Sequence, residues 1–282
     1  MQESTANYNI RPLQEEALKI FKEFKRICDK HKLKYYAAYG TALGAVRHHG
    51  FIPWDDDLDV VMPREDYNQF VKIVKHELSG TIKFLRGGES FYAPITFGRM
   101  INERDHVVKE LSVSTRLPIK DPPFIDIFVL EGIPDNILCI KSWFRQRRLW
   151  RVSQLYRYPC AGYGMPVFRR LVSMIAGLFL STKYRQTFDN EDMMCVYDEL
   201  ACQWSTSKNV IEPSFFRMKE SRILSRSFFE PARELPFEDT HIRIAANVEE
   251  ILTRYYGDYM QLPPEKDRLP PHVMRLNYEG HV

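Results

Sequence analysis

The sequence predicts an α/β protein in which a mixed β-sheet is flanked by helices and the second half of the chain is mainly helical. Two observations lead to this fold class. A helix, a strand and a second helix are followed by further apolar runs of strand type, an order typical of a central sheet covered by helices. The chain has 282 residues, 44% of them hydrophobic and 13% aromatic, which excludes a disordered protein and allows a full core.

Each expected element has its own local signal. Residues 11–31 predict an amphipathic helix because apolar side chains recur at helical spacing, at Leu13, Ala17, Phe21, Phe24 and Cys28. Residues 35–39 predict the first strand, and residues 64–78 predict a helix that begins after a proline. Further strands are expected at residues 82–85, 92–100 and 124–130, and from residue 135 onward the pattern becomes helical.

The densest chemical signal is the run from Asp55 to Asp59, which holds four carboxylates in five positions. Carboxylates this close repel one another unless a cation shares them. On a strand, Asp57 and Asp59 would point to the same face, since successive side chains alternate. Two oxygen ligands on one face suit Mg²⁺ bound together with substrate phosphates, so we expect metal-assisted chemistry on a phosphate. The alternative is an exposed acidic turn with no catalytic residue.

A third carboxylate, Asp126, lies inside the apolar run of residues 124–129. A buried and unpaired Asp is costly, so it should have a charged partner, and the same metal is one candidate. The alternative is an edge-strand Asp that faces water. Together with Gly40-Thr41 and the Asp57-Leu58-Asp59 step, Asp126 resembles the acidic pattern of nucleotidyltransferase-fold proteins.

The run from Tyr39 to Met62 closely resembles the signature of LicD-family phosphotransferases, and more loosely that of fukutin-related proteins. It contains Gly-Thr-x-Leu-Gly-Ala-x-Arg-His-x-Gly-Phe-Ile-Pro-Trp-Asp-Asp-Asp. A weaker resemblance covers residues 255–266, with His272 after it. We therefore expect a nucleotidyltransferase-like catalytic core in residues 1–134, a basic, aromatic helical insert in residues 135–205, and a C-terminal part, residues 206–282, that completes the catalytic domain.

The resemblance implies transfer of phosphocholine from CDP-choline to a sugar hydroxyl of a cell-surface glycan of the lipopolysaccharide, teichoic acid or capsule type. Asp57, Asp59 and Asp126 would then hold Mg²⁺, with Mn²⁺ as an alternative, and Asp126 is also a candidate general base. Phosphoethanolamine, glycerol phosphate or ribitol phosphate from a CDP donor, and true nucleotidyl transfer, are alternatives. A hypothesis of another class is a non-catalytic module that recruits glycan or lipid.

Five residues are expected to bind the donor: Gly40, Thr41, Arg47, Trp54 and Arg99. Gly40 and Thr41 would let a helix N-terminus approach the phosphates, although Thr41 is equally suited to a simple N-cap. The planar fork of Arg47 suits a phosphate or a carboxylate. Trp54 is either core packing or a cation-binding face. Arg99 is expected to pair with a member of the acidic run from Asp55 to Asp59 or with a donor phosphate, or to serve the structure alone.

A transferred choline group would seek aromatic faces for its quaternary ammonium. The sequence does not distinguish among six candidates for such a cage: Tyr35, Tyr36, Tyr39, Trp54, Phe91 and Tyr92. The neighbouring His48 and His49 are expected to be structural or solvent-facing. Asp258 is expected to cap a turn.

Residues 141–185 contain ten Lys and Arg and no Asp or Glu, interleaved with aromatic residues, in a chain of formal net charge +3. Such a segment favours an anionic membrane surface or a lipid-linked glycan acceptor. The alternatives are an ordinary helical pair with solvated Arg residues and, less favoured, nucleic-acid binding, which we do not expect. The five cysteines form no CxxC pair, and the N-terminus lacks signal-peptide features. We expect a cytoplasmic protein, peripheral at the inner face of the membrane if the basic segment binds lipid.

Overall fold

The computed structural model describes residues 9–78, 80–86, 97–104, 107–110, 118–136, 139–141, 171, 175, 203, 206–212, 222–270 and 276–278. Phe91, Tyr92, His272 and most of the basic segment 141–185 therefore lie outside the described residues. Within the described part of the chain, no helix is long and apolar enough to cross a membrane.

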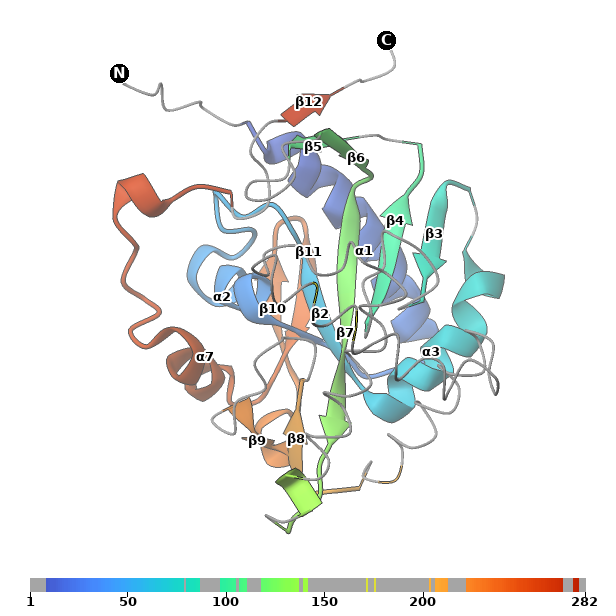
Figure 1. The fold of residues 1–282 in the computed structure, drawn as a ribbon, viewed down its shortest axis with the longest axis vertical. Helices are drawn as coiled ribbons and strands as arrows, with labels where there is room; N and C mark the ends of the chain where they lie inside the picture. Colours follow the sequence, from blue (N-terminus) through green and yellow to red (C-terminus); the bar gives the residue numbers. More distant parts are fainter. Residues whose placement is uncertain are drawn as a thin grey trace.

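A curled mixed β-sheet forms the centre of the protein (Figure 1). Its strands follow the order β1 (Tyr36–Ala37), β2 (Asp59–Pro63), β7 (Phe124–Gly132), β4 (Gly98–Asn102) and β3 (Ile82–Leu85). In addition, β8 (Asn209–Ile211) pairs with β7, and β9 (Leu224–Ser225) pairs with β8. Strands β2 and β7 are parallel, whereas the other pairs of this sheet are antiparallel. Every residue of β7 is buried, as is typical of a central strand.

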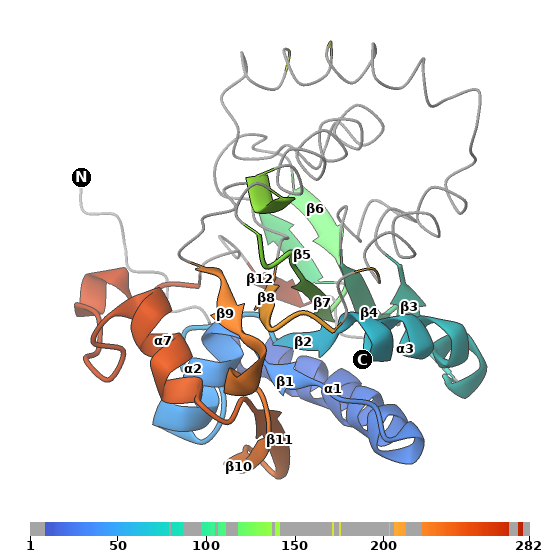
Figure 2. The same ribbon diagram turned by 90° about the horizontal axis from the view of Figure 1, so that it is seen from below.

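Of the helices whose bounds the described residues give, α1 (Arg11–His31), α2 (Tyr39–His48), α3 (Arg64–Glu77) and α7 (Val248–Tyr256) pack around this sheet. Helices α1 and α3 meet through Phe24 and Phe70, whose ring centroids are 5.2 Å apart. Figure 2 shows α1 running along one side of the sheet, whereas α2 and α7 lie next to each other. The apolar face of α1 is buried as its sequence periodicity predicts.

The remaining described elements are short. Strands β10 (Arg233–Phe237) and β11 (Thr240–Ile244) form an antiparallel hairpin. A separate sheet places β5 (Val107–Glu110) between β6 (Pro118–Asp121) and β12 (Leu276–Tyr278). A 3₁₀ turn, η3 (Arg226–Phe228), precedes the β10–β11 hairpin, and another, η4 (Glu265–Asp267), follows α7.

The α/β fold class is confirmed, and so are most of the predicted elements in the first half. The helix over residues 11–31 and the strand over 82–85 have the predicted bounds. The helix predicted over residues 64–78 is α3, which ends one residue earlier, at Glu77. The first strand is shorter than predicted because Tyr39 already begins α2. The strand expected at 92–100 is found at Gly98–Asn102, and residues 92–96 lie outside the described residues. The expected helical pattern does not hold at residues 209–211, 224–225 and 233–244, where β8 to β11 form.

Candidate active site

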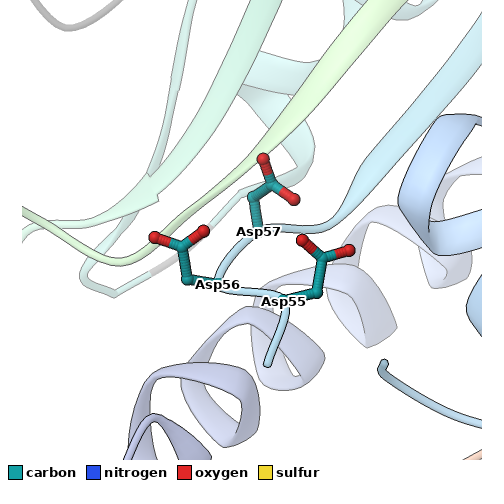
Figure 3. A group of neighbouring side chains, drawn as sticks. All are labelled: Asp55, Asp56 and Asp57. Atoms are coloured by element: carbon teal, nitrogen blue, oxygen red, sulfur yellow. The ribbon is translucent and has the colours of Figure 1, made fainter. Parts of the chain in front are cut away.

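The acidic run lies in the loop that leads from α2 into β2. Figure 3 shows the side chains of Asp55, Asp56 and Asp57 on this short loop. Each offers a carboxylate oxygen, and these three oxygens lie within 4.8 Å of one another. Among the described residues, these three carboxylates form the group of three or more metal-binding side chains whose ligand atoms lie close enough together to share one cation. A donor set made of carboxylate oxygens alone fits a hard cation such as Mg²⁺, so the residues present fit the predicted metal.

Asp59, Asp126 and Arg99 form a row across three neighbouring strands. Asp126 of β7 is the register partner of Asp59 in β2 and of Arg99 in β4, so the three side chains lie on one face of the sheet. The Arg99 guanidinium donates from Nε to Asp126 Oδ1 at 2.6 Å and from Nη2 to Asp126 Oδ2 at 2.9 Å. It also stacks on the Phe124 ring, 3.6 Å from the centroid.

The charged partner expected for Asp126 is therefore Arg99. The expected pairing of Arg99 with the acidic run from Asp55 to Asp59, or with a donor phosphate, stays a prediction. The alternative of an edge-strand Asp126 is wrong, since β7 is central and the side chain is buried. The two oxygens of Asp126 are both engaged by the guanidinium. If Asp126 also binds a metal or acts as a base, it does so with oxygens that already accept hydrogen bonds from Arg99.

Asp59 is buried at the start of β2 with several carboxylates around it. Burial, and then the negative charges of Asp57, Asp126 and Asp55, raise its pKa well above the ordinary value, while Arg99 acts in the opposite direction. The loop carboxylates and the strand carboxylates thus act on one another electrostatically. A divalent cation bound there would offset this repulsion.

The placement of Asp57 corrects one inference from the sequence. Strand β2 begins at Asp59, so Asp57 precedes the strand and does not alternate with Asp59 along it. Asp57 lies with Asp55 and Asp56 in the loop. Sequence alternation failed here because the first carboxylates of the run lie in the irregular loop that precedes the strand.

Gly40 and Thr41 bring the first turn of α2 onto the acidic loop. A Cβ atom at Gly40 would overlap Asp55 Oδ2, so only glycine allows this approach without displacing the carboxylate. Thr41 Oγ1 accepts a hydrogen bond from the backbone N–H of Asp59 at 2.8 Å. The N-cap of α2 is Ala38, so Thr41 is not the N-cap that the sequence allowed. Thr41 positions Asp59, and the contact of Gly40 and Thr41 with donor phosphates stays a prediction.

Arg47 and Trp54 make contacts with the segment after α7. The Nη1 of Arg47 donates to the carbonyl oxygen of Tyr259 at 2.6 Å. Trp54 packs edge-to-face on His48, with ring centroids 6.2 Å apart, and Arg268 lies 5.5 Å from its ring centroid. Trp54 therefore does present a face to a cation, and that cation is Arg268. The binding of donor by Arg47 stays a prediction.

The predicted aromatic cage is dispersed. Tyr35 is a fully buried core residue, and Tyr36 donates its hydroxyl hydrogen bond to Glu230 at 2.7 Å. Tyr39 faces Tyr255 of α7 in a stacked pair, with centroids 5.8 Å apart. Tyr255 belongs to the C-terminal resemblance but was not among the predicted cage residues, because the sequence does not show that α7 packs on α2.

Two polar residues far from the acidic run hold its loop in place, and both were missed. The buried Nε2 of Gln14 in α1 donates to the carbonyl oxygens of Ile52, at 3.1 Å, and Asp55, at 2.8 Å. Glu238, in the turn of the β10–β11 hairpin, accepts a hydrogen bond from the Phe51 N–H at 3.0 Å. The available signal for Gln14 was an uncharged polar residue between the apolar positions of an amphipathic helix.

Tyr256, at the end of α7, also belongs to the surroundings of the carboxylates. Its side chain is partly exposed. Partial burial, and then the charges of Asp59, Asp55 and Asp57, raise the pKa of its phenol. The C-terminal helix therefore reaches the same site as α2 and β2.

Comparison with known proteins agrees with the signature. Residues 32–161 match the family described as LicD/FKTN/FKRP, nucleotidyltransferase domain. Over 266 residues, the chain is 28% identical to the lipopolysaccharide cholinephosphotransferase LicD of Haemophilus influenzae, covering 94% of this chain and 96% of that protein. Residues 32–161 therefore form a LicD-family domain. The resemblance expected from the sequence is confirmed.

Two shorter matches are to uncharacterized rickettsial proteins. One from Rickettsia typhi is 44% identical over 55 residues, which is 20% of this chain and 18% of that protein. One from Rickettsia prowazekii is 38% identical over 69 residues, 24% of this chain and 26% of that protein. The LicD-family match at residues 32–161 includes Asp59, Asp126 and Arg99, whereas Gln14, Glu238 and the residues of α7 lie outside it.

Proposed function

We propose that this LicD-family chain is a phosphotransferase that moves a phosphocholine group to a hydroxyl of a lipopolysaccharide-type glycan. The near full-length relationship to a lipopolysaccharide cholinephosphotransferase supports this reaction class. The observation that carries the proposal is the convergence of Asp55, Asp56 and Asp57 with the Asp59–Asp126 row at the start of β2. A site of this kind suits the transfer of a charged phosphoryl group.

In finer detail, we propose CDP-choline as the donor and Mg²⁺ as the metal, with Mn²⁺ as an alternative. Asp57 and Asp59 would hold the ion with help from Asp55 and Asp56. When bound, the ion supplies positive charge against the donor diphosphate. Thr41 fixes the backbone of Asp59 at the start of β2, and Arg99 orients the Asp126 carboxylate, before any ligand binds.

The test is turnover of CDP-alcohols by the purified chain. With lipopolysaccharide added as acceptor, we expect transfer of phosphocholine to a sugar hydroxyl, or slowly to water, with release of CMP that requires Mg²⁺ and stops with EDTA. CDP-ethanolamine, CDP-glycerol and CDP-ribitol should be used at least about tenfold less efficiently. Turnover of another CDP-alcohol in preference to CDP-choline would change the transferred group. Absence of turnover with every donor would contradict the proposal that the chain is an enzyme. It would favour the alternative of a non-catalytic module that recruits glycan or lipid.

The basic segment 141–185 lies almost wholly outside the described residues. What this segment binds is therefore proposed from its sequence alone. We expect it to hold the enzyme at an anionic membrane, where its substrate glycan is assembled on lipid. In flotation experiments, the protein should bind vesicles that contain phosphatidylglycerol at low salt and leave them at high salt. Equal binding to neutral vesicles, or none at low salt, would contradict this location.

The hydrogen bonds of Gln14 lead to a further prediction. Changing Gln14 to Met keeps the length of the side chain but leaves the carbonyl groups of Ile52 and Asp55 without its two N–H donors. We expect a loss of about 1–3 kcal/mol in the free energy of unfolding, together with weaker Mg²⁺-dependent turnover, because the loop that carries the carboxylates loosens. Urea unfolding and CMP release measure the two effects. The matched control is Gln69→Met on the exposed face of α3, which should change neither.

A further inference from the structure

A cavity lies between helices α2 and α7 and the central sheet. Its lining includes Tyr39 and Ala42 of α2, Val61 of β2, Leu130 of β7, Tyr255 of α7, and Glu212, which directly follows β8. The other lining residues are aliphatic or aromatic. The cavity is therefore an apolar space with one carboxylate in its wall.

The cavity is on the same face of the sheet as the candidate metal site. Val61 is two residues beyond Asp59 along β2, and Leu130 is four residues beyond Asp126 along β7, so all four side chains point to one face. Each step of two residues along a strand is about 6.6 Å. The cavity thus begins roughly one such step from the carboxylate row.

Two pairs of adjacent residues connect the cavity with the acidic loop. In α2, Tyr39 lines the cavity while the next residue, Gly40, touches Asp55. In α7, Tyr255 lines the cavity while the next residue, Tyr256, has a pKa raised partly by the loop carboxylates. A group attached through a short link to a phosphate at the carboxylates would therefore reach this cavity.

The polar chemistry of the cavity wall suits a cation. The buried Glu212 accepts a hydrogen bond from the Tyr39 hydroxyl, and burial together with the Glu212 charge raises the pKa of Tyr39 well above the ordinary value. The Tyr39 ring also packs edge-to-face on Phe128, with centroids 5.4 Å apart. Arg222 already places its guanidinium 5.5 Å from the centroid of the Tyr255 ring. The Tyr255 ring thus lies between the stacked Tyr39 ring and a guanidinium, so a second cation in the cavity would share this wall with Arg222.

We propose that this cavity, with Glu212, Tyr39 and Tyr255 in its wall, receives the quaternary ammonium of the donor. This inference rests on the proposed function, because it assigns the choline end of the same substrate. Aromatic rings and a carboxylate attract a methylated ammonium, and aliphatic walls suit its methyl groups. A primary ammonium needs acceptors for three N–H donors, which a largely apolar wall does not offer. The cavity thus selects choline over ethanolamine.

The experiment compares Glu212→Gln with the wild type. Glutamine keeps the shape and still accepts a hydrogen bond from Tyr39, but it removes the negative charge. We expect the KM for CDP-choline to rise about tenfold, while the KM for the neutral donor CDP-glycerol does not change. The matched control is Glu230→Gln, since Glu230 also accepts a tyrosine hydroxyl, that of Tyr36, and does not line the cavity. It should leave both values unchanged.

Direct binding separates this inference from the proposed function. Two ligands are titrated into wild type and variant by calorimetry. One is phosphocholine, and the other is the phosphate ester of 3,3-dimethylbutanol, in which an uncharged tert-butyl group replaces the trimethylammonium group. Tighter binding of phosphocholine than of the neutral ester, lost in Glu212→Gln, supports the cavity even if the chain turns over no donor. Equal binding of the two esters, or an unchanged ratio of KM values, overturns it even if CDP-choline is a substrate. If Glu212→Gln does not fold, Tyr255→Leu, which removes the ring and keeps apolar volume, is measured in the same way with the same criteria.

Discussion

Replacing Asp59 with Asn should abolish Mg²⁺-dependent turnover and, at the same time, make the metal-free protein more stable. Asp59 is buried, and Asp57, Asp126 and Asp55 all oppose its negative charge. Asparagine keeps the size of the side chain and removes the charge. We expect turnover to fall on the order of 10³-fold, since a ligand of the ion that offsets phosphoryl charge is lost. We expect the free energy of unfolding in EDTA to rise, because the buried charge that the neighbouring carboxylates oppose is gone.

Urea unfolding with and without Mg²⁺ measures the second effect. Mg²⁺ should stabilise the wild type, because it binds the folded protein, and should stabilise Asp59→Asn much less. Asp57→Asn should also lose turnover, with a smaller gain in metal-free stability, because Asp57 lies in the loop rather than at the start of the strand. Asp258→Asn is the control, since Asp258 is exposed and its carbonyl only closes a turn with Gln261. Full turnover by Asp59→Asn would show that the metal assignment is wrong.

The acidic run shows what the sequence can and cannot predict about this site. Residue types and spacing were enough to identify the signature, the strand that carries Asp126 and the need of Asp126 for a charged partner. The point at which β2 begins was not predictable, because it depends on contacts with other elements. The Asp59 N–H donates to Thr41 of α2, and the Asp59 carbonyl oxygen accepts from the Ala38 N–H at 3.0 Å. These contacts set Asp57 outside the strand.

The C-terminal part illustrates a second limit. Strands β8 to β11 are two to five residues long. In β10, four of five residues are at least partly exposed and one of them is Pro236, so the strand has no alternating pattern to detect. Its hairpin nevertheless places Glu238 against the loop at Phe51. Long-range support of this kind comes from tertiary contacts, and periodicity within one segment does not report it.

Removing the positive charge of Arg99 should cause the largest loss of stability at the site. Arg99→Leu leaves Asp126 buried, without its guanidinium and next to Asp59 in the neighbouring strand. Removing one partner of a buried ion pair costs about 3–5 kcal/mol, because the remaining charge is uncompensated. Arg99→Lys should be intermediate, since a single ammonium cannot reproduce the two hydrogen bonds of the guanidinium or its stacking on Phe124.

A double variant separates the charge effect from the loss of packing. If the uncompensated carboxylate causes the loss, Arg99→Leu combined with Asp126→Asn should recover most of it in urea unfolding, whereas a loss caused by poor packing of Leu would remain. The matched surface control is Lys83→Leu. Lys83 pairs with Glu103 at 3.6 Å, and both side chains are 54% exposed, so this change should alter the free energy of unfolding by well under about 1 kcal/mol. A similarly small effect of Arg99→Leu would mean that water or another cation compensates the charge of Asp126. The Arg99–Asp126 ion pair would then not be needed to hold Asp126 beside Asp59.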